Sequence, residues 1–294
     1  MEGEEGVLIV DDSISEKPYT DENEIICWHY DHTTGRTLKG INFDSALYHH
    51  AGLSLPVDYH LVAKTETDTD AKTGKPKRRS PITKNAVYQR MVRQAIANQI
   101  PFRYGLNDVW FASAENMPLV HDDLKREFVM PLKCNRKVAL SLKAKQRGQY
   151  VRVESLSLEA ETVMAIYVEA VTFPLLLVKQ HFTNEDGTVA FLYLVTSDLL
   201  LTYSQITTLY RKRWNVEHFH KSLKQNVALA QSSTKTVTTQ SNHLFASLCA
   251  YLKLEMFKRT ASSNHFAFKA KLYLSALQSA FRALQALHPI SLAA

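Results

Sequence analysis

Four apolar residues at positions 7–10, Val-Leu-Ile-Val, are followed at once by Asp11 and Asp12. A short continuous apolar run of this kind is typical of a strand that is buried on both faces in the middle of a sheet. The sequence therefore predicts a buried central strand with carboxylates at its C-terminal tip.

A helix and a second acidic strand tip follow in the first half of the chain. Residues 83–98 carry Val87, Met91 and Ala95 in one helical row, which predicts an amphipathic helix. Residues 100–106 favour a strand, and Asp108 follows it. Further strands are expected at 25–30, 58–63 and 128–132.

The second half divides into a β-rich stretch and a helical stretch. Strand-forming residues dominate from 137 to 200, with a hairpin turn expected at 184–187. From Ser204 onward the sequence favours helices at 204–226, 241–259 and 266–287. The class expected is α/β.

Residues 64–81 are polar and rich in turn formers, so we expect an exposed loop. Its second half contains the basic residues Lys72, Lys75, Lys77, Arg78 and Arg79. Such a run is typical of a solvated surface. The alternative is a loop that contacts phosphates.

The expected helix 204–226 has two distinct faces. At about 100° per residue, an apolar face gathers Leu209, Val216, Phe219 and Leu223. A neighbouring arc of about 100° holds Tyr210, Arg213, Trp214, Glu217, Lys221 and Lys224. One interpretation is a set of i,i+4 ion pairs on an exposed helix. The other is a carboxylate that binds a metal ion next to bases that hold a polyanion.

The spacing of Tyr210, Arg213, Glu217 and Lys224, with two, three and six residues between them, resembles the Y-(2)-R-(3)-E-(6)-K signature of bacterial insertion-sequence DDE transposases. The surrounding Arg-Trp-x-Val-Glu-x-Phe-His-Lys-x-Leu-Lys is similar to the same group. The resemblance implies a ribonuclease-H-like mixed sheet with flanking helices, a β-rich insertion before the last catalytic helix, and a helical C-terminus. It implies a core at 1–136 and 201–235, an insertion at 137–200 and a helical region at 236–294.

The resemblance also implies a catalytic triad. It expects one aspartate at the tip of the first strand and another at the tip of the fourth, and Asp11 and Asp108 stand there, with Glu217 as the third acid. Alternation along a strand sends Asp11 and Asp12 to opposite sides. The family pattern favours Asp11, with Asp12 as the alternative.

A metal-dependent reaction on DNA follows from the same resemblance. Asp11, Asp108 and Glu217 would bind two Mg²⁺ ions, with Mn²⁺ as a substitute, for cleavage at transposon ends and strand transfer into target DNA. Tyr210, Arg213, Lys221 and Lys224 would contact the double-stranded DNA, and a homodimer would form the synaptic complex. In relatives that form DNA hairpins a tryptophan lies in the insertion. Here the tryptophans are Trp28, Trp110 and Trp214, so Phe173 or Tyr193 is the substitute if a hairpin forms.

Composition sets the remaining expectations for this chain of 294 residues. The hydrophobic share of 45% is that of an ordinary folded protein, and the net charge of +6 permits an acidic partner without requiring one. The apolar runs are too short to cross a membrane. The resemblance implies a cytoplasmic, nucleoid-associated bacterial protein. Because only ten residues precede Asp11, the alternative is an N-terminally truncated, non-catalytic remnant or inhibitor that binds full-length transposase. A ribonuclease-H-like nuclease without a role in transposition is a third possibility.

Overall fold

The computed structural model describes residues 6–31, 35–69, 71, 74–159, 161–183, 186–232, 234–261 and 263–287. Two compact units make up the chain, Met1–His218 and Phe219–Ala294. Lys72, one of the five basic residues expected in a loop, lies outside the described residues.

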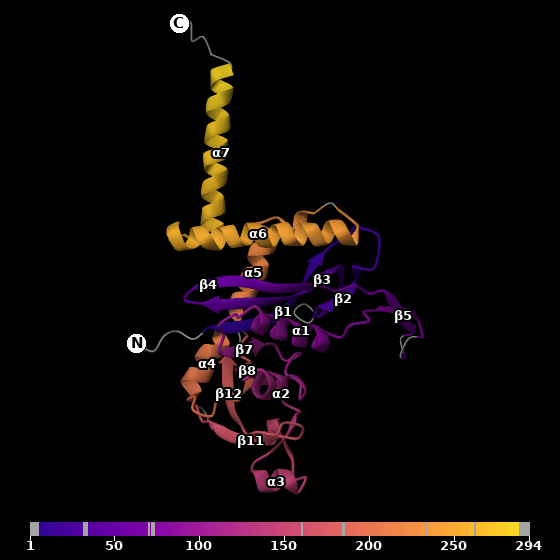
Figure 1. Cartoon of the computed structure of the whole chain (residues 1–294), viewed down its shortest axis with the longest axis vertical. Coiled ribbons are helices and arrows are strands. Elements are labelled where there is room, and N and C mark those ends of the chain that lie inside the picture. Colours follow the sequence, from indigo (N-terminus) through magenta and orange to yellow (C-terminus); the bar gives the residue numbers. More distant parts are fainter. Residues whose placement is uncertain are drawn as a thin grey trace. The chain divides into compact units, whose positions relative to one another are not determined.

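A large mixed sheet organises the first unit (Figure 1). Its strands are β1 (Val7–Glu16), β2 (Ile26–Asp31), β3 (Arg36–His50), β4 (Leu53–Leu61), β7 (Tyr104–Asn107), β8 (Glu127–Leu132), β9 (Lys137–Ala139), β10 (Val151–Arg152), β11 (Met164–Val168), β12 (Leu175–Thr183) and β13 (Val189–Thr196). Their order is β10-β9-β11-β12-β13-β8-β7-β1-β3-β2, and β4 also pairs with β3. The short strands β5 (Glu66–Thr69) and β6 (Pro76–Arg79) form a separate hairpin.

The centre of the sheet is the part most clearly encoded in the sequence. Strand β1 pairs antiparallel with β3 and parallel with β7, and β7 pairs parallel with β8. Val7 and Ile9 are fully buried, as are Phe128 and Val129 of β8, because both faces of these strands are covered. The predicted buried central strand is confirmed, and this mixed sheet has the ribonuclease-H-like arrangement that the resemblance implies.

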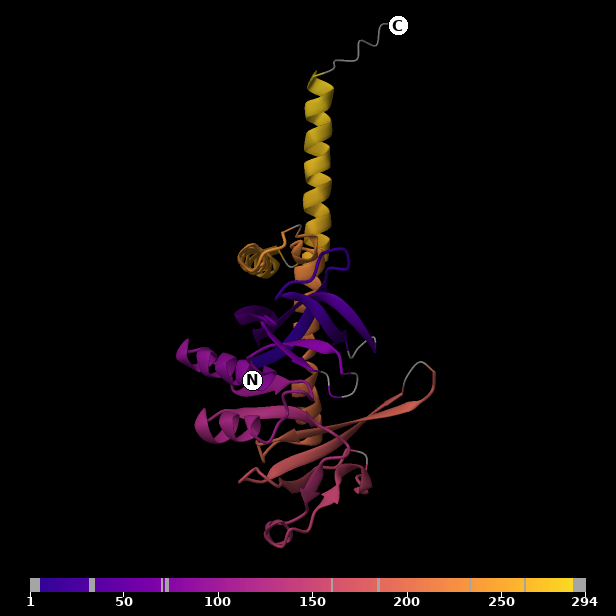
Figure 2. The same ribbon diagram turned by 90° about the vertical axis from the view of Figure 1, so that its right-hand side faces the viewer.

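The insertion extends the same sheet. Strand β13 pairs antiparallel with β8, and β12 with β13 in a long hairpin (Figure 2). The β-rich character predicted for 137–200 is therefore confirmed, while the division into core, insertion and C-terminal region stays a prediction.

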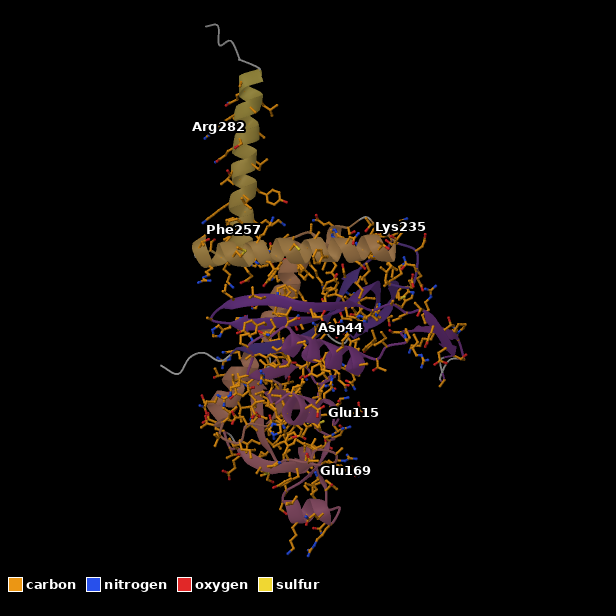
Figure 3. All side chains as sticks on the ribbon, in the orientation of Figure 1. Asp44, Glu115, Glu169, Lys235, Phe257 and Arg282 are labelled. Carbon is orange, nitrogen blue, oxygen red and sulfur yellow. The ribbon has the colours of Figure 1, made fainter. Side chains whose placement is uncertain are left out.

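The helices include the predicted ones. Thr83 caps α1 (Lys84–Ala97) by accepting a hydrogen bond from the Ala86 amide, and the helix buries Val87 and Met91. The second unit contains α6 (Val237–Ala261) and α7 (His265–Leu287), which confirm the helical C-terminus. Figure 3 shows side chains, Arg282 among them, standing out along α7. None of the helices that the structure describes has the length and apolarity needed to cross a lipid bilayer.

The remaining helical segments are short or lie near the last expected catalytic residue. They are α2 (Asn116–Pro118), η1 (Leu119–Asp123), α3 (Leu142–Gln146), η2 (Val153–Ser155), α4 (Tyr203–Arg211), α5 (Trp214–Gln225) and η3 (Leu229–Gln231).

Three expectations were wrong in detail. Residues 204–226 form two helices, α4 and α5, although the segment contains neither glycine nor proline. The 64–81 loop contains the hairpin β5–β6, whose exposed polar strands have no apolar alternation to mark them. The long strand β3 was not expected, because buried polar residues such as Asn42, Asp44 and Ser45 interrupt its apolar pattern.

Candidate active site

The parallel ladder between β1 and β7 brings two of the predicted acids together. Its last pair is Val10 with Asn107, so Asp11 and Asp108 are the next residues on adjacent strands. Strand β1 continues to Glu16 through its pairing with β3, so Asp11 does not stand at the tip of its own strand as predicted. It stands where the parallel pairing with β7 ends.

Asp11 and Asp12 have different partners, as strand alternation requires. An Oδ2 atom of Asp11 accepts a hydrogen bond from Nη1 of Arg213 at 3.0 Å. Oδ2 of Asp12 instead lies 2.7 Å from Nζ of Lys84, at the start of α1, and accepts a 3.2 Å hydrogen bond from Asn42. Asp11 therefore shares its partner arginine with the predicted catalytic glutamate.

Arg213 contacts acids from the beginning and the end of the first unit, Asp11 and Glu217. Its Nη1 atom also lies 3.5 Å from Oε1 of Glu217, one helical turn further along. The side chain of Arg213 is 13% exposed and that of Glu217 is 47% exposed, so a buried cation reaches out to an accessible acid. The prediction from spacing that Arg213 and Glu217 share a face holds across the short turn between α4 and α5.

That turn has a local cause. The amides of Lys212, Arg213, Asn215 and Val216 all bond three residues back, which tightens the chain into a 3₁₀-like turn. The side-chain amide of Asn215 donates to the carbonyl of Lys212 at 2.7 Å and competes with helix continuation there. The helix predicted over 204–226 is therefore interrupted between α4 and α5.

Tyr210 packs beside these residues, between the end of β7 and Arg213. It is buried, and its hydroxyl donates to the backbone carbonyl of Asn107, the last residue of β7, at 3.4 Å. The guanidinium of Arg213 lies 5.9 Å from its ring centroid. Burial raises the pKa of Tyr210 well above its usual range, so its hydroxyl stays protonated and able to donate.

The pKa values of the two aspartates, Asp11 and Asp108, are raised in the folded chain. Burial, followed by repulsion from Asp108, raises the pKa of Asp11 to about 8, against the attraction of Arg213. The negative charge of Glu217 also raises the pKa of Asp11. Burial also raises the pKa of Asp108. The site is therefore short of positive charge when its carboxylates are ionised.

One further acid was missed by sequence reasoning. Asp44 lies opposite Asp12 in the pairing of β1 with β3 and is 1% exposed, among the strands in Figure 3. Within the described residues neither of its carboxylate oxygens has a hydrogen-bond partner. Burial and the charge of Asp12 raise its pKa to about 7. The signal was the aspartate in an otherwise strand-like sequence, which was hidden because β3 was not recognised.

Comparison with known families identifies the fold's relatives. A sequence profile described as DDE superfamily endonuclease matches residues 1–152, which is more than half of the chain and includes both Asp11 and Asp108. The chain belongs to the DDE superfamily endonucleases. No curated protein matches its sequence.

Membership in this superfamily implies a divalent metal, and the donor atoms of the site suit one. Carboxylate oxygens are the ligands that Mg²⁺ prefers, and a cation would offset the burial and the repulsion from Asp108 that raise the pKa of Asp11. In the part of the chain that the structure describes, no three acidic, histidine or cysteine side chains lie close enough to hold one ion. Arg213 provides the compensating charge between Asp11 and Glu217 instead.

The two lysines that were predicted to bind DNA follow Glu217 along α5. Lys221 and Lys224 fall in the second unit of this DDE endonuclease, while Glu217 falls in the first. Nζ of Lys221 lies 5.5 Å from the ring centroid of Phe266. In the insertion, Tyr193 is buried and Phe173 contacts the ring of His121 at 4.1 Å between centroids.

Proposed function

We propose that this DDE endonuclease is a bacterial insertion-sequence transposase that cuts DNA at transposon ends and transfers the freed strand into target DNA by a cut-and-paste route. One observation carries the proposal. Asp11 and Asp108 are neighbours across β1 and β7, and Arg213 links Asp11 to Glu217 from a segment about 200 residues away in sequence.

The acids have separate tasks in this proposal. Asp11, Asp108 and Glu217 would hold two Mg²⁺ ions, or Mn²⁺ in their place, and Glu217 is the most accessible of the three. When bound, the metal ions supply activation of a water or a 3′-hydroxyl and stabilisation of the leaving oxygen. Asp11 is the buried acid of the set, and its carboxylate is held by Arg213 and by the backbone amide of Asp12.

The bases have the complementary task. Arg213 offers a planar fork that suits a phosphate, and Lys221 and Lys224 offer point charges along α5. Tyr210 would complete this DNA-binding set. A homodimer at paired transposon ends and a place on the bacterial nucleoid complete the proposal.

The test is a nicking assay on a labelled duplex taken from the DNA that flanks the gene for this chain. The purified chain is incubated with MgCl₂ or MnCl₂, with EDTA as the metal-free arm. We expect nicks at one defined boundary, and we expect Glu217→Gln to remove them, since it keeps the size of the side chain and loses the charge. Glu169→Gln, the same change at an exposed position after β11, is the matched control and keeps the nicks.

The outcomes separate the alternatives. Nicking without a preferred position would favour a ribonuclease-H-like nuclease outside transposition. Binding to a full-length transposase with no nicking under any metal would favour the non-catalytic remnant. Nicking that survives in Glu217→Gln would contradict the assignment of the site.

A further inference from the structure

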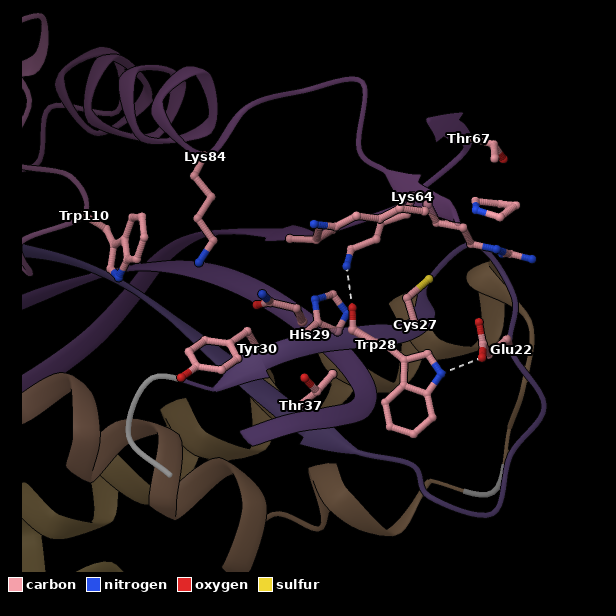
Figure 4. A pocket seen from close by; sticks show the side chains of 15 residues that line it. Glu22, Cys27, Trp28, His29, Tyr30, Thr37, Lys64, Thr67, Lys84 and Trp110 are labelled. Carbon is pink, nitrogen blue, oxygen red and sulfur yellow. Dashed lines mark hydrogen bonds between the residues drawn. The ribbon is translucent and has the colours of Figure 1, made fainter. Parts of the chain in front are cut away.

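A cavity of about 860 Å³ lies in the first unit, between the β2–β3 strands, the β5–β6 hairpin and the start of α1 (Figure 4). Of the described residues that line it, Lys64, Lys77, Arg78 and Lys84 are cationic and Glu22 is acidic. Burial and the charges of Lys64 and Lys84 lower the pKa of the lining His29 to about 4, so that ring is neutral. The cavity is therefore positively charged and suits an anionic ligand.

Aromatic rings line the same cavity. Trp28 is 51% exposed, Tyr30 is 55% exposed and Trp110 is 46% exposed. Figure 4 shows Trp110 with Tyr30 towards one end of the cavity and Trp28 towards the other. A single exposed ring is common on protein surfaces. Several accessible rings among cations are instead typical of surfaces that stack bases while binding phosphates.

Two contacts join the cavity to aspartates at the candidate site, one to Asp108 and one to Asp12, the neighbour of Asp11. Lys84, which lines the cavity, holds Asp12 at 2.7 Å. The backbone amide of Trp110 donates to Oδ1 of Asp108 at 2.9 Å. The cavity therefore adjoins the end of β7 that carries Asp108.

We propose that this cavity binds an unpaired stretch of the DNA strand next to the cleaved phosphate. The proposal rests on the proposed function, because it assigns a second contact to the same substrate. Bases stack on Trp28 and Trp110, and phosphates lie against Lys77 and Arg78 of the β5–β6 hairpin. The volume is that of a small-molecule site, which holds about one or two nucleotides rather than a duplex. Stacking on a ring also requires that the face of the base be free, as it is in unpaired DNA.

The test compares the binding of three fluorescein-labelled DNAs by anisotropy: a blunt duplex and the same duplex with a short single-stranded extension at its 5′ or 3′ end. We expect one extension to tighten binding by roughly fivefold or more, and 2-aminopurine placed in it to be quenched. Trp28→Ala should abolish both effects and Trp28→Phe should restore most of them. Tyr19→Ala, a fully exposed ring outside the cavity lining, is the control that keeps both.

Further arms separate this proposal from the proposed function. Glu217→Gln should lose nicking and keep the preference for the extension. A wild-type chain with that preference but without nicking would support the cavity and overturn the nuclease assignment. Equal binding of blunt and extended DNA, or a preference that survives in Trp28→Ala, would overturn the cavity proposal. Displacement of the extension by free deoxyadenosine monophosphate at equal affinity would also overturn it, because the site would then recognise a free nucleotide.

Discussion

The acids around Asp11 and the cavity around Trp28 belong to the same unit but differ in their exposure to water and in their charge. Asp11 is 7% exposed and its pKa is raised by burial and by other acids, whereas Trp28 is 51% exposed among cations. A buried acid is stable in its ionised form only with a counter-cation, whereas exposed rings and cations remain hydrated and need no such compensation. The first region is therefore built to take up a cation, and the second to take up an anionic, base-bearing chain.

The largest expected effect on activity comes from replacing an acid of the candidate site. Asp108→Asn should abolish Mg²⁺-dependent nicking, because an amide replaces one of the anionic oxygens that would hold the metal. Asp122→Asn, a change in η1, is the control. Nicking by Asp108→Asn at more than a tenth of the wild-type rate, measured by gel electrophoresis, would contradict a metal-binding role for this residue.

Replacing Arg213 tests whether this residue compensates the negative charge of the acids when no metal is bound. Arg213→Ala should lower the free energy of unfolding at pH 8 by about 2 kcal/mol, because the buried Asp11 loses a charged hydrogen-bond donor and has to take up a proton. Mg²⁺ should recover part of this loss.

The control for that variant is Arg90→Ala, which breaks a more exposed ion pair with Asp58 and should cost less than about 1 kcal/mol. Urea unfolding with EDTA or with MgCl₂ measures both. Equal losses in the two variants, with no effect of Mg²⁺, would show that Arg213 does not compensate the acids.

The pH dependence sharpens the comparison further. The pKa of Asp11 is about 8 in the folded state and near its ordinary value of 3.8 when unfolded. Between these values the folded chain keeps a proton that the unfolded chain has lost, so the free energy of unfolding falls as pH rises from about 4 to about 8. Asp11→Asn should flatten this fall in metal-free urea titrations. An identical slope in wild type and variant would contradict the burial of an ionisable group at this position.

The smallest expected effect concerns the cavity. Lys77→Ala should reduce the salt dependence of DNA binding, lowering the slope of log K against log salt by about 0.7–0.9, because one phosphate contact is lost. Lys143→Ala, on the separate short helix α3, should leave the slope unchanged. Anisotropy titrations at several salt concentrations measure it, and equal slopes would show that Lys77 does not contact phosphate.

The sequence predicted the centre of the sheet well, since β1 and β8 are apolar runs that only a buried strand explains. It predicted helix α1 from its apolar rows. It failed where polar residues are buried, as in β3, and where strands are fully exposed, as in β5 and β6. In both cases the apolar alternation that marks a strand is missing.

The candidate site divides in the same way. The spacing of Arg213 and Glu217 places them on one helical face, a local relation that sequence can provide. The approach of Asp11 to Asp108 depends on the register of two strands, and the roles of Lys84 and Asp44 depend on packing across the sheet. The cavity joins segments from 22 to 110, and the sequence left its basic hairpin open between a solvated surface and a phosphate contact.

The most direct test of the central claim is the nicking activity of two neighbouring variants, Asp11→Asn and Asp12→Asn, on the same duplex with Mg²⁺. Asp11 shares Arg213 with Glu217, whereas Asp12 pairs with Lys84. We predict that Asp11→Asn has no detectable nicking and that Asp12→Asn keeps measurable activity. Loss in Asp12→Asn with activity retained in Asp11→Asn would contradict the account and place the reacting acids on the Lys84 side of β1.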